Sequence, residues 1–236
     1  MLGASKVNFG LANAGGEPWV TDGLVMLFDA NRSDSYPGSG TTVTDLSGNG
    51  YNATLSGVGY STTTTYSHTG GFFTFDGNDV INGSSNSALN LTGSMTVEVL
   101  FYYSSGANDW IRLIGKGDGT NRTYGLWIHP NGTLLYQRYG STNMNISVGS
   151  GYSANNWYHI VGVSNGSSHT FYRDKASIGT SSSGSTFHSS TSALTLGKHP
   201  NIHDYHRGGI SYAAVYNRAL SLSEVTQNND YISERF

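Results

Sequence analysis

The sequence has 236 residues, no cysteine, a formal net charge of −3 and only 11% charged residues. The lack of a basic excess argues against nucleic-acid binding through phosphate neutralisation, and the lack of cysteine excludes disulfides and thiol chemistry. No segment is long and apolar enough to span a membrane, so we expect no membrane insertion.

The N-terminal segment differs in composition from the rest of the chain. Residues 1–22 are rich in small side chains and show neither a helical nor a strand period. They also lack the long apolar core of a secretory signal peptide, so we expect a protein made in the cytoplasm without export. We predict an N-terminal arm at 1–22 that docks on the chain or on a partner, followed by one domain at 23–236.

From residue 23 onward, short apolar runs alternate with turn signals. Pro130-Asn131-Gly132 and Asn165-Gly166 are typical of hairpin turns between two strands. The runs lie at 23–30, 70–79, 95–103, 123–139, 156–180, 192–199 and 208–217. Short strands at this spacing predict an all-β fold, an antiparallel sandwich of two sheets or a jelly roll.

One helix signal stands near the C-terminus. Ser221 and Glu224 have the spacing of a capping box. Leu222, Val225 and Ile232 are spaced to form one apolar face. We therefore predict one short C-terminal helix after the last strand.

A histidine-rich segment, KHPNIHDYHRGG, begins at Lys198. On a helix, His199, His203 and His206 would share one face and could bind a transition metal. The proline and glycines favour a loop, in which that spacing loses its meaning. The loop is then a polar surface segment in which these histidines and Tyr205 contact a glycan or a neighbouring subunit.

The motif DLSGNG at 45–50 begins like a calcium loop of the EF-hand type. Asp45 and Asn49 stand at alternate oxygen positions, and a glycine follows. An EF-hand needs an acidic residue at its twelfth position, and here that position is Ser56. The EF-hand interpretation therefore fails, and a turn between strands remains.

The order of these segments resembles the laminin-G-like branch of the concanavalin A-like lectin/glucanase superfamily. The resemblance runs from Gly23 to about Asn228, and its most specific part is AVYNRALSLSEVTQN near the end. The segment from Asp29 to Asn49 is similar to the form common in bacteriophage virion proteins. The resemblance implies a jelly roll of two facing antiparallel sheets.

The resemblance also implies a structural calcium ion at a rim of the sandwich. Oxygen-rich turns that suit a hard cation contain Asp29, Asp45, Asn49, Asp76 and Asp79. The alternative is that these residues end strands and form Asx turns, which turn chemistry alone explains. No other cofactor is expected.

Lectins of this superfamily bind sugars on aromatic platforms. Trp110, Trp127, Tyr136 and Tyr139 are the candidates for such a platform, although Trp127 and Trp157 lie within strand patterns and are equally suited to the core. Its glucanases use closely spaced carboxylates, which a retaining mechanism needs. The corresponding strand carries only Glu98, so we expect no enzyme.

Three functions follow from the resemblance. The first is a non-enzymatic structural protein of a tailed-phage virion, as a capsid decoration or fibre protein or a tail adhesin. It would bind other virion proteins through the arm, bind a host cell-surface glycan, and form a homo-oligomer. The second is a free-standing carbohydrate-binding module, and the third is a glycoside hydrolase that uses Glu98.

Overall fold

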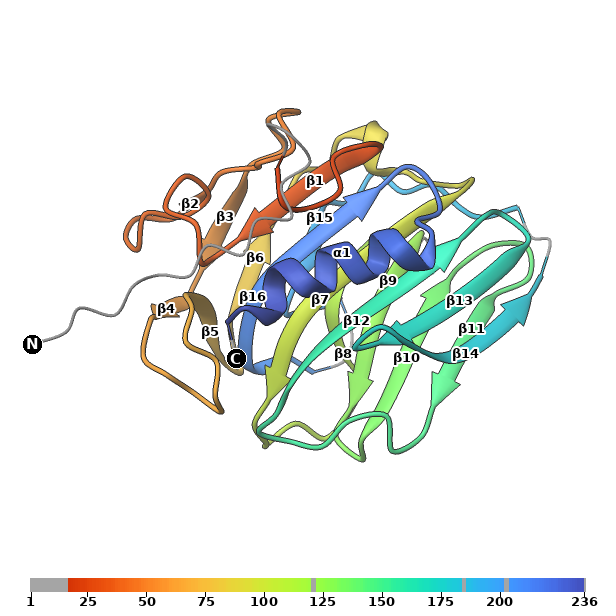
Figure 1. Ribbon diagram of the computed structural model, residues 1–236. Coiled ribbons are helices and arrows are strands. Elements are labelled where there is room, and N and C mark those ends of the chain that lie inside the picture. Colours follow the sequence, from red (N-terminus) through yellow and green to blue (C-terminus); the bar gives the residue numbers. More distant parts are fainter. Residues whose placement is uncertain (1–16, 120–121, 184–185, 202–203, 236) are drawn as a thin grey trace, which may run out of the picture.

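The computed structural model describes residues 17–119, 122–183, 186–201 and 204–235. Within these ranges, sixteen strands form two antiparallel sheets that face each other, and one helix lies across the outside of one sheet (Figure 1). The predicted fold class, an antiparallel jelly-roll sandwich with one short C-terminal helix, is confirmed.

The first sheet has the order β14-β13-β12-β7-β16-β5-β4, and β1 pairs with β16. β1 and β5 share one edge of β16, because β1 pairs with its C-terminal half and β5 with its N-terminal half. The strands of this sheet are β1 (Leu24–Asp29), β4 (Gly59–Ser61), β5 (Phe72–Asp76), β7 (Met95–Tyr103), β12 (Trp157–Ser164), β13 (Ser168–Arg173), β14 (Ala176–Ser182) and β16 (Arg207–Tyr216).

The second sheet has the order β11-β10-β9-β8-β15-β6-β3-β2. A short 3₁₀ helix at Ser87–Leu89 leads from β6 toward β7. The strands of this sheet are β2 (Thr42–Val43), β3 (Ala53–Ser56), β6 (Val80–Asn82), β8 (Ile111–Lys116), β9 (Tyr124–His129), β10 (Thr133–Arg138), β11 (Met144–Val148) and β15 (Leu194–Leu196).

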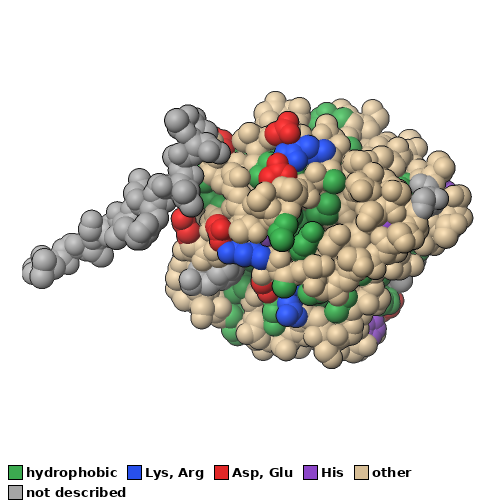
Figure 2. Space-filling model, turned by 45° about the vertical axis from the view of Figure 1, so that its right-hand side comes forward, with side chains coloured by type: hydrophobic (Ala, Val, Ile, Leu, Met, Phe, Trp, Pro, Cys, Tyr) green, Lys and Arg blue, Asp and Glu red, His purple; other side chains and the backbone are tan. Residues whose placement is uncertain are grey.

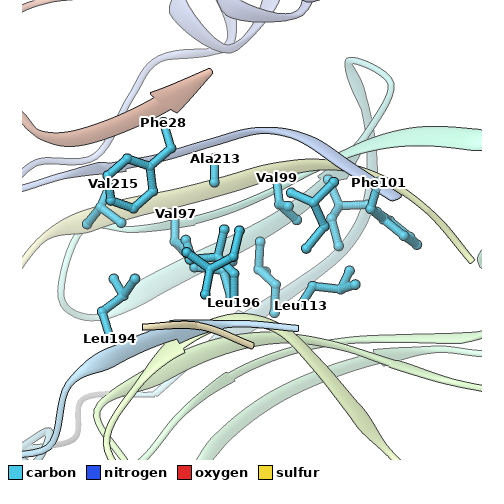
Figure 3. Packing of buried hydrophobic residues seen from close by; sticks show 14 of the residues in the cluster. Phe28, Val97, Val99, Phe101, Leu113, Leu194, Leu196, Ala213 and Val215 are labelled. Carbon is cyan, nitrogen blue, oxygen red and sulfur yellow. The ribbon is translucent and has the colours of Figure 1, made fainter. Parts of the chain in front are cut away.

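The main core fills the space between the sheets. Val97, Val99 and Phe101 alternate along β7 and point into this space, because side chains of a strand alternate between its two faces. Figure 3 shows them opposite Leu113 and Leu196 of the second sheet. Each of these five side chains is fully buried, so the sandwich is held by apolar burial from both faces.

The helix α1 (Leu222–Ser233) covers the outer face of the first sheet (Figure 1). The predicted capping box is present, because the Ser221 hydroxyl accepts from the Glu224 amide while the Glu224 carboxylate accepts from the Ser221 amide. Val225 and Ile232 face the sheet as predicted. Leu222 was predicted to join them, but it is 54% exposed because it stands at the first helical position, before the turn that meets the sheet.

The structure describes residues 17–22 of the predicted arm, and these residues pack on the domain itself. Trp19 and Val20 are buried in the cluster between α1 and the first sheet. The Val20 amide donates to Asn228 of α1 (2.8 Å), and its carbonyl accepts from the Tyr216 hydroxyl (3.1 Å). The chain therefore crosses the helix before it enters β1. Residues 1–16 of the predicted arm lie outside the described residues.

The predicted hairpins at 130–132 and 165–166 join β9 to β10 and β12 to β13. Gly132 and Gly166 both have positive φ, which glycine adopts without steric cost. The sequence patterns missed β2, β4, β6, β8 and β11. β2, β4 and β6 have only two or three residues, too few to show a period. β11 (MNISV) does alternate apolar and polar side chains, and its buried positions follow that alternation.

Charged side chains are sparse on the surface shown in Figure 2, and basic groups lie beside acidic ones. Arg218 contacts both Asp22 (2.8 Å) and Glu224 (2.7 Å), and Lys175 pairs with Asp230. Among the residues that the structure describes, no helix combines the length and the hydropathy needed to cross a membrane.

Candidate functional site

The second sheet carries a depression on its outer face. Its volume is about 230 Å³, and strands β9 and β10 form its floor. The side chains of Leu126, Ile128 and Leu134 enter the core, so the residues that alternate with them point away from it. The described residues that line the depression are Trp110, Arg122, Trp127, Leu135, Gln137 and Tyr139.

Two glycines make room for the large side chains of this face. Gly115 of β8 and Gly125 of β9 lie directly opposite each other. A Cβ atom on Gly125 would lie 2.6 Å from Nε1 of Trp127, and one on Gly115 would lie 2.7 Å from Cδ of Arg112. Any side chain at either position would therefore push the indole or the guanidinium out of place.

Two arginines flank the indole of Trp127. The Cζ atoms of Arg122 and Arg112 lie 5.1 Å and 5.7 Å from its ring centroid. Arg122 also lies over the ring of Tyr139, at 4.8 Å. A guanidinium over an aromatic face is attracted by the negative face of the ring, so these contacts hold both groups in position.

Burial disfavours the charged form of both guanidinium groups. Burial, helped by the nearby charge of Arg122 and opposed by the smaller effects of Tyr124 and Asp118, lowers the pKa of Arg112 to about 9. Burial also lowers the pKa of Arg122. Both remain charged at neutral pH, which makes this face locally positive.

The loop that follows β15 supports the depression from one side. The imidazole of His199 is buried and stacks on Trp127, with ring centroids 5.5 Å apart. The Asp204 carboxylate accepts from the backbone amides of Asn108 and Asp109, which fixes the segment that carries Trp110. The predicted loop and the predicted aromatic residue are thus neighbours in space.

The remaining predicted contact residues of this loop are placed differently. Tyr205 is partly exposed and has the Lys198 ammonium 3.9 Å from its ring centroid. His206 was predicted to contact a ligand, but it is fully buried against Phe75 and Tyr103. Burial lowers its pKa to about 4. His203 lies outside the described residues.

The predicted aromatic platform is partly assembled. Trp110, Trp127 and Tyr139 line one depression, whereas Tyr136 is fully buried between the sheets. The reason is the strand period, because Tyr136 pairs with Leu126 on the core face and Leu135 pairs with Trp127 on the outer face. Arg122, Gln137 and the two glycines were not predicted, because only the register of β8, β9 and β10 brings them to this face.

Asp29, a predicted calcium ligand, makes its side-chain hydrogen bonds inside the protein. Its carboxylate is buried and accepts from the Tyr231 hydroxyl (2.7 Å) and the Arg235 guanidinium (2.6 Å). These donors come from α1 and the residues after it, so Asp29 ties the end of β1 to the C-terminal segment.

The predicted ligand Asp45 organises its own loop. One carboxylate oxygen accepts from the amides of Leu27 and Ser47, and the other accepts from the Ser47 hydroxyl and the Tyr51 amide. The Asn49 side chain donates to the Val25 carbonyl (3.0 Å). Asp45 and Asn49 thus stabilise a turn, which is the alternative to a calcium site given for these residues.

The remaining predicted ligands, Asp76 and Asp79, share the turn between β5 and β6. Asp79 accepts from the Asp76 amide (2.6 Å). Burial raises the pKa of Asp79, and the nearby Asp76 carboxylate raises it further. In the described part of the chain, no three histidine, aspartate or glutamate side chains come together as a metal site. Calcium binding stays a prediction.

Glu98, the residue on which the hydrolase alternative depends, lies between the first sheet and α1 and is fully buried. Its carboxylate accepts from the Tyr212 hydroxyl (2.9 Å) and the Asn228 amide (2.8 Å), and it lies 3.1 Å from Nε2 of His159. A carboxylate enclosed in this way cannot reach a substrate.

Comparisons with known proteins agree with the fold. Residues 75–226 match the sequence model of a family described as the concanavalin A-like lectin/glucanases superfamily. A comparison with curated proteins gave no match.

Solved structures share the fold at low identity. The binding domain of Paraclostridial Mosquitocidal Protein 1 has a TM-score of 0.68 at 18% identity, over 89% of this chain and 52% of that one. The binding domain of Botulinum Neurotoxin DC in complex with SialylT has a TM-score of 0.66 at 14% identity, over 90% of this chain and 52% of that one. Trypanosoma rangeli sialidase has a TM-score of 0.64 at 18% identity, over 89% of this chain and 33% of that one. This chain thus spans about half the length of the toxin chains and a third of the sialidase.

Proposed function

Because the chain belongs to the concanavalin A-like lectin/glucanase superfamily, we propose that it is a non-enzymatic domain that binds carbohydrate. The proposed site is the depression on the outer face of the second sheet. The observation that carries the proposal is the convergence of Trp110, Trp127 and Tyr139, from three separate segments, around one hollow.

The depression has the two kinds of group that a sugar ring requires. The partly exposed rings of Trp110 and Tyr139 offer flat apolar surfaces for the C–H face of a sugar. Arg122 and Gln137 supply donors and an acceptor for hydroxyl groups at the same place. Binding sites for small molecules combine such apolar walls with a few polar groups.

The placement of Glu98 supports a non-enzymatic role for the domain. The family's glucanases need two carboxyl groups beside the sugar bond. Glu98 is enclosed by Tyr212, Asn228 and His159, and no acidic side chain is among the described residues that line the depression.

A glycan array with the full chain tests the proposal. We expect binding that Trp110→Ala and Tyr139→Ala each weaken by about tenfold or more, as for the loss of one stacked ring. Tyr66→Ala is the matched control, because Tyr66 is a 47% exposed aromatic residue that packs on Tyr102 of the first sheet. An array without any bound glycan, or equal losses in all three variants, would overturn the proposal.

We also propose that the domain is a surface component of a tailed-phage particle, as a capsid decoration or fibre protein or as a tail adhesin. The support is the similarity of the segment from Asp29 to Asn49 to phage virion proteins. Mass spectrometry of purified particles is the test, and consistent absence of the chain from the particles would contradict the proposal.

A further inference from the structure

We propose that the depression receives the terminal sugar of a glycan chain, and that the next sugar rests on β11, in contact with Asn145 and Ser147. This inference rests on the proposed carbohydrate function and adds which part of a glycan is bound. The support is an asymmetry of the outer face of the second sheet, which is covered on one side of the depression and exposed on the other.

The face is covered on the side of β8 and β15. Arg112 of β8 and Thr195 of β15 stand on it, and they are 0% and 4% exposed. Arg112 donates to the Thr195 hydroxyl (2.5 Å), which donates to the Lys198 carbonyl (2.5 Å) in the loop after β15. The same loop stacks the buried imidazole of His199 on Trp127. A sugar chain therefore cannot continue across the sheet in this direction.

The face is exposed on the side of β11, which is the edge strand of the sheet. Ser147 pairs with Leu135 and Asn145 pairs with Gln137, so both stand on the face that carries the depression. Both are exposed, while the residues that alternate with them are buried. Neighbouring strands lie about 4.8 Å apart, so β11 is within reach of a sugar linked directly to the one in the depression.

Hydrogen bonds join the depression to β11. Arg122 donates to the side-chain carbonyl of Gln137 (3.3 Å), and the Gln137 amide donates to the side-chain carbonyl of Asn145 (2.8 Å). This second bond fixes the orientation of the Asn145 side chain, because its oxygen is the engaged atom. The exposed Asn145 amide and the Ser147 hydroxyl then supply donors and an acceptor for the hydroxyl groups of a second sugar.

The two positions differ in what they contribute. The depression offers the rings of Trp110 and Tyr139, whereas β11 offers only short polar side chains on this face. Hydrogen bonds formed in competition with water add modestly to affinity, so we expect a gain of about three- to tenfold from the second sugar. A third sugar should add little, because β11 is the last strand of the sheet.

The first experiment measures affinity against chain length by titration calorimetry. The probes are the best-binding oligosaccharide of the glycan array and its fragments of one, two and three sugars with the same terminal sugar. For a β-1,4-glucan, these fragments are methyl β-glucoside, cellobiose and cellotriose. Single sugars are measured by displacement of the longest fragment. We expect the affinity to rise about three- to tenfold from one sugar to two and to stay constant beyond two.

Stoichiometry is the second readout of the same titrations. Because only a terminal sugar fits between the depression and the covered side, each chain should bind one protein however long it is. A site that binds the interior of a chain would instead take up several proteins on one long chain.

The second experiment uses variants of β11. Ser147→Ile suits a strand, and its stiff branched side chain would occupy the place of the second sugar. It should abolish the gain from the second sugar and leave the affinity for a single sugar unchanged. Asn145→Asp keeps an oxygen that accepts from Gln137 but loses the amide donor, so it should reduce the same gain. Ser177→Ile is the matched control, because Ser177 is an exposed serine on the edge strand of the other sheet.

The outcomes separate this inference from the function on which it rests. Equal affinity for one and two sugars, affinity that keeps rising with longer chains, several proteins bound to one chain, or a Ser147→Ile protein that keeps the gain would overturn the inference. Each of these results would leave carbohydrate binding in the depression intact. An array without any bound glycan would overturn both.

Discussion

At the scale of single residues, the buried polar groups under α1 are the most consequential. Glu98 is ringed by Tyr212, Asn228 and His159, and His159 in turn contacts Asn229 of the helix. A buried carboxylate is tolerated only where hydrogen bonds replace its hydration. The network therefore aligns the helix on the sheet, and this accounts for an acidic residue within an otherwise apolar strand.

We expect Glu98→Gln to destabilise the fold by about 2–4 kcal/mol, because an amide group would replace an acceptor that faces three partners. Urea unfolding measures the effect. Glu17→Gln is the control, since the Glu17 side chain is 49% exposed. A Glu98→Gln protein as stable as the unmodified one would contradict this structural role.

At the scale of elements, α1 shows how a local signal and a tertiary contact combine. Its capping box is complete, and the Glu224 carboxylate also pairs with Arg218. The Arg218 hydrogen bond is the main cause that lowers the pKa of Glu224 to about 2, and Ser221 adds to it. The first turn of the helix is therefore tied to the end of β16.

We expect Ser221→Ala to lower the stability by about 1 kcal/mol, the usual value of an N-cap side chain. The Glu224 contribution should be present above its unfolded pKa, near 4.5, and be lost as the pH falls from there toward 2. Thermal unfolding at pH 7 and at pH 3 measures both effects. Ser189→Ala is the control for the serine, because Ser189 is exposed and lies in a loop away from the helix.

The sequence predicts one part of the depression, the pairing of two strands that form its floor, but not the register of the third strand. The hairpin turn at 130–132 predicts that β9 and β10 are neighbours, and this is confirmed. It does not reveal the irregularity in the β8–β9 register between Arg112 and Ile114. That irregularity places Arg112 opposite Trp127, so the pair of guanidinium groups around this indole had no signal in the sequence.

At the scale of the whole molecule, a buried histidine should make stability depend on pH. His206 is fully buried, and its pKa is lowered from 6.5 to about 4. Protonation therefore favours the unfolded chain, so this part of the stability is complete above pH 6.5 and is lost as the pH falls from 6.5 to 4.

We expect His206→Phe to remove this dependence, with a loss between pH 7 and pH 5 that is smaller by about 2 kcal/mol than in the unmodified protein. Urea unfolding at the two pH values measures it. His188→Phe is the control, because His188 is exposed. An equal loss in the unmodified protein and in His206→Phe would show that His206 does not titrate as its burial implies.

The sequence by itself determined the fold class, the main strands, the two glycine hairpins and the capped C-terminal helix. These features depend on local chemistry: strand period, positive φ at glycine, and the reach of a serine side chain. It also determined the family, which the match over residues 75–226 confirms.

Only the tertiary structure decided which face each aromatic side chain occupies. Trp127 and Tyr136 stand in neighbouring strands with similar apolar surroundings, yet one lines the depression and the other fills the core. Alternation along a strand separates two faces, but it does not say which face meets the other sheet. That depends on how the sheets pack. The packing of the sheets also enclosed His206, the packing of α1 on the first sheet enclosed Glu98, and Arg122 was left at the surface of the proposed site.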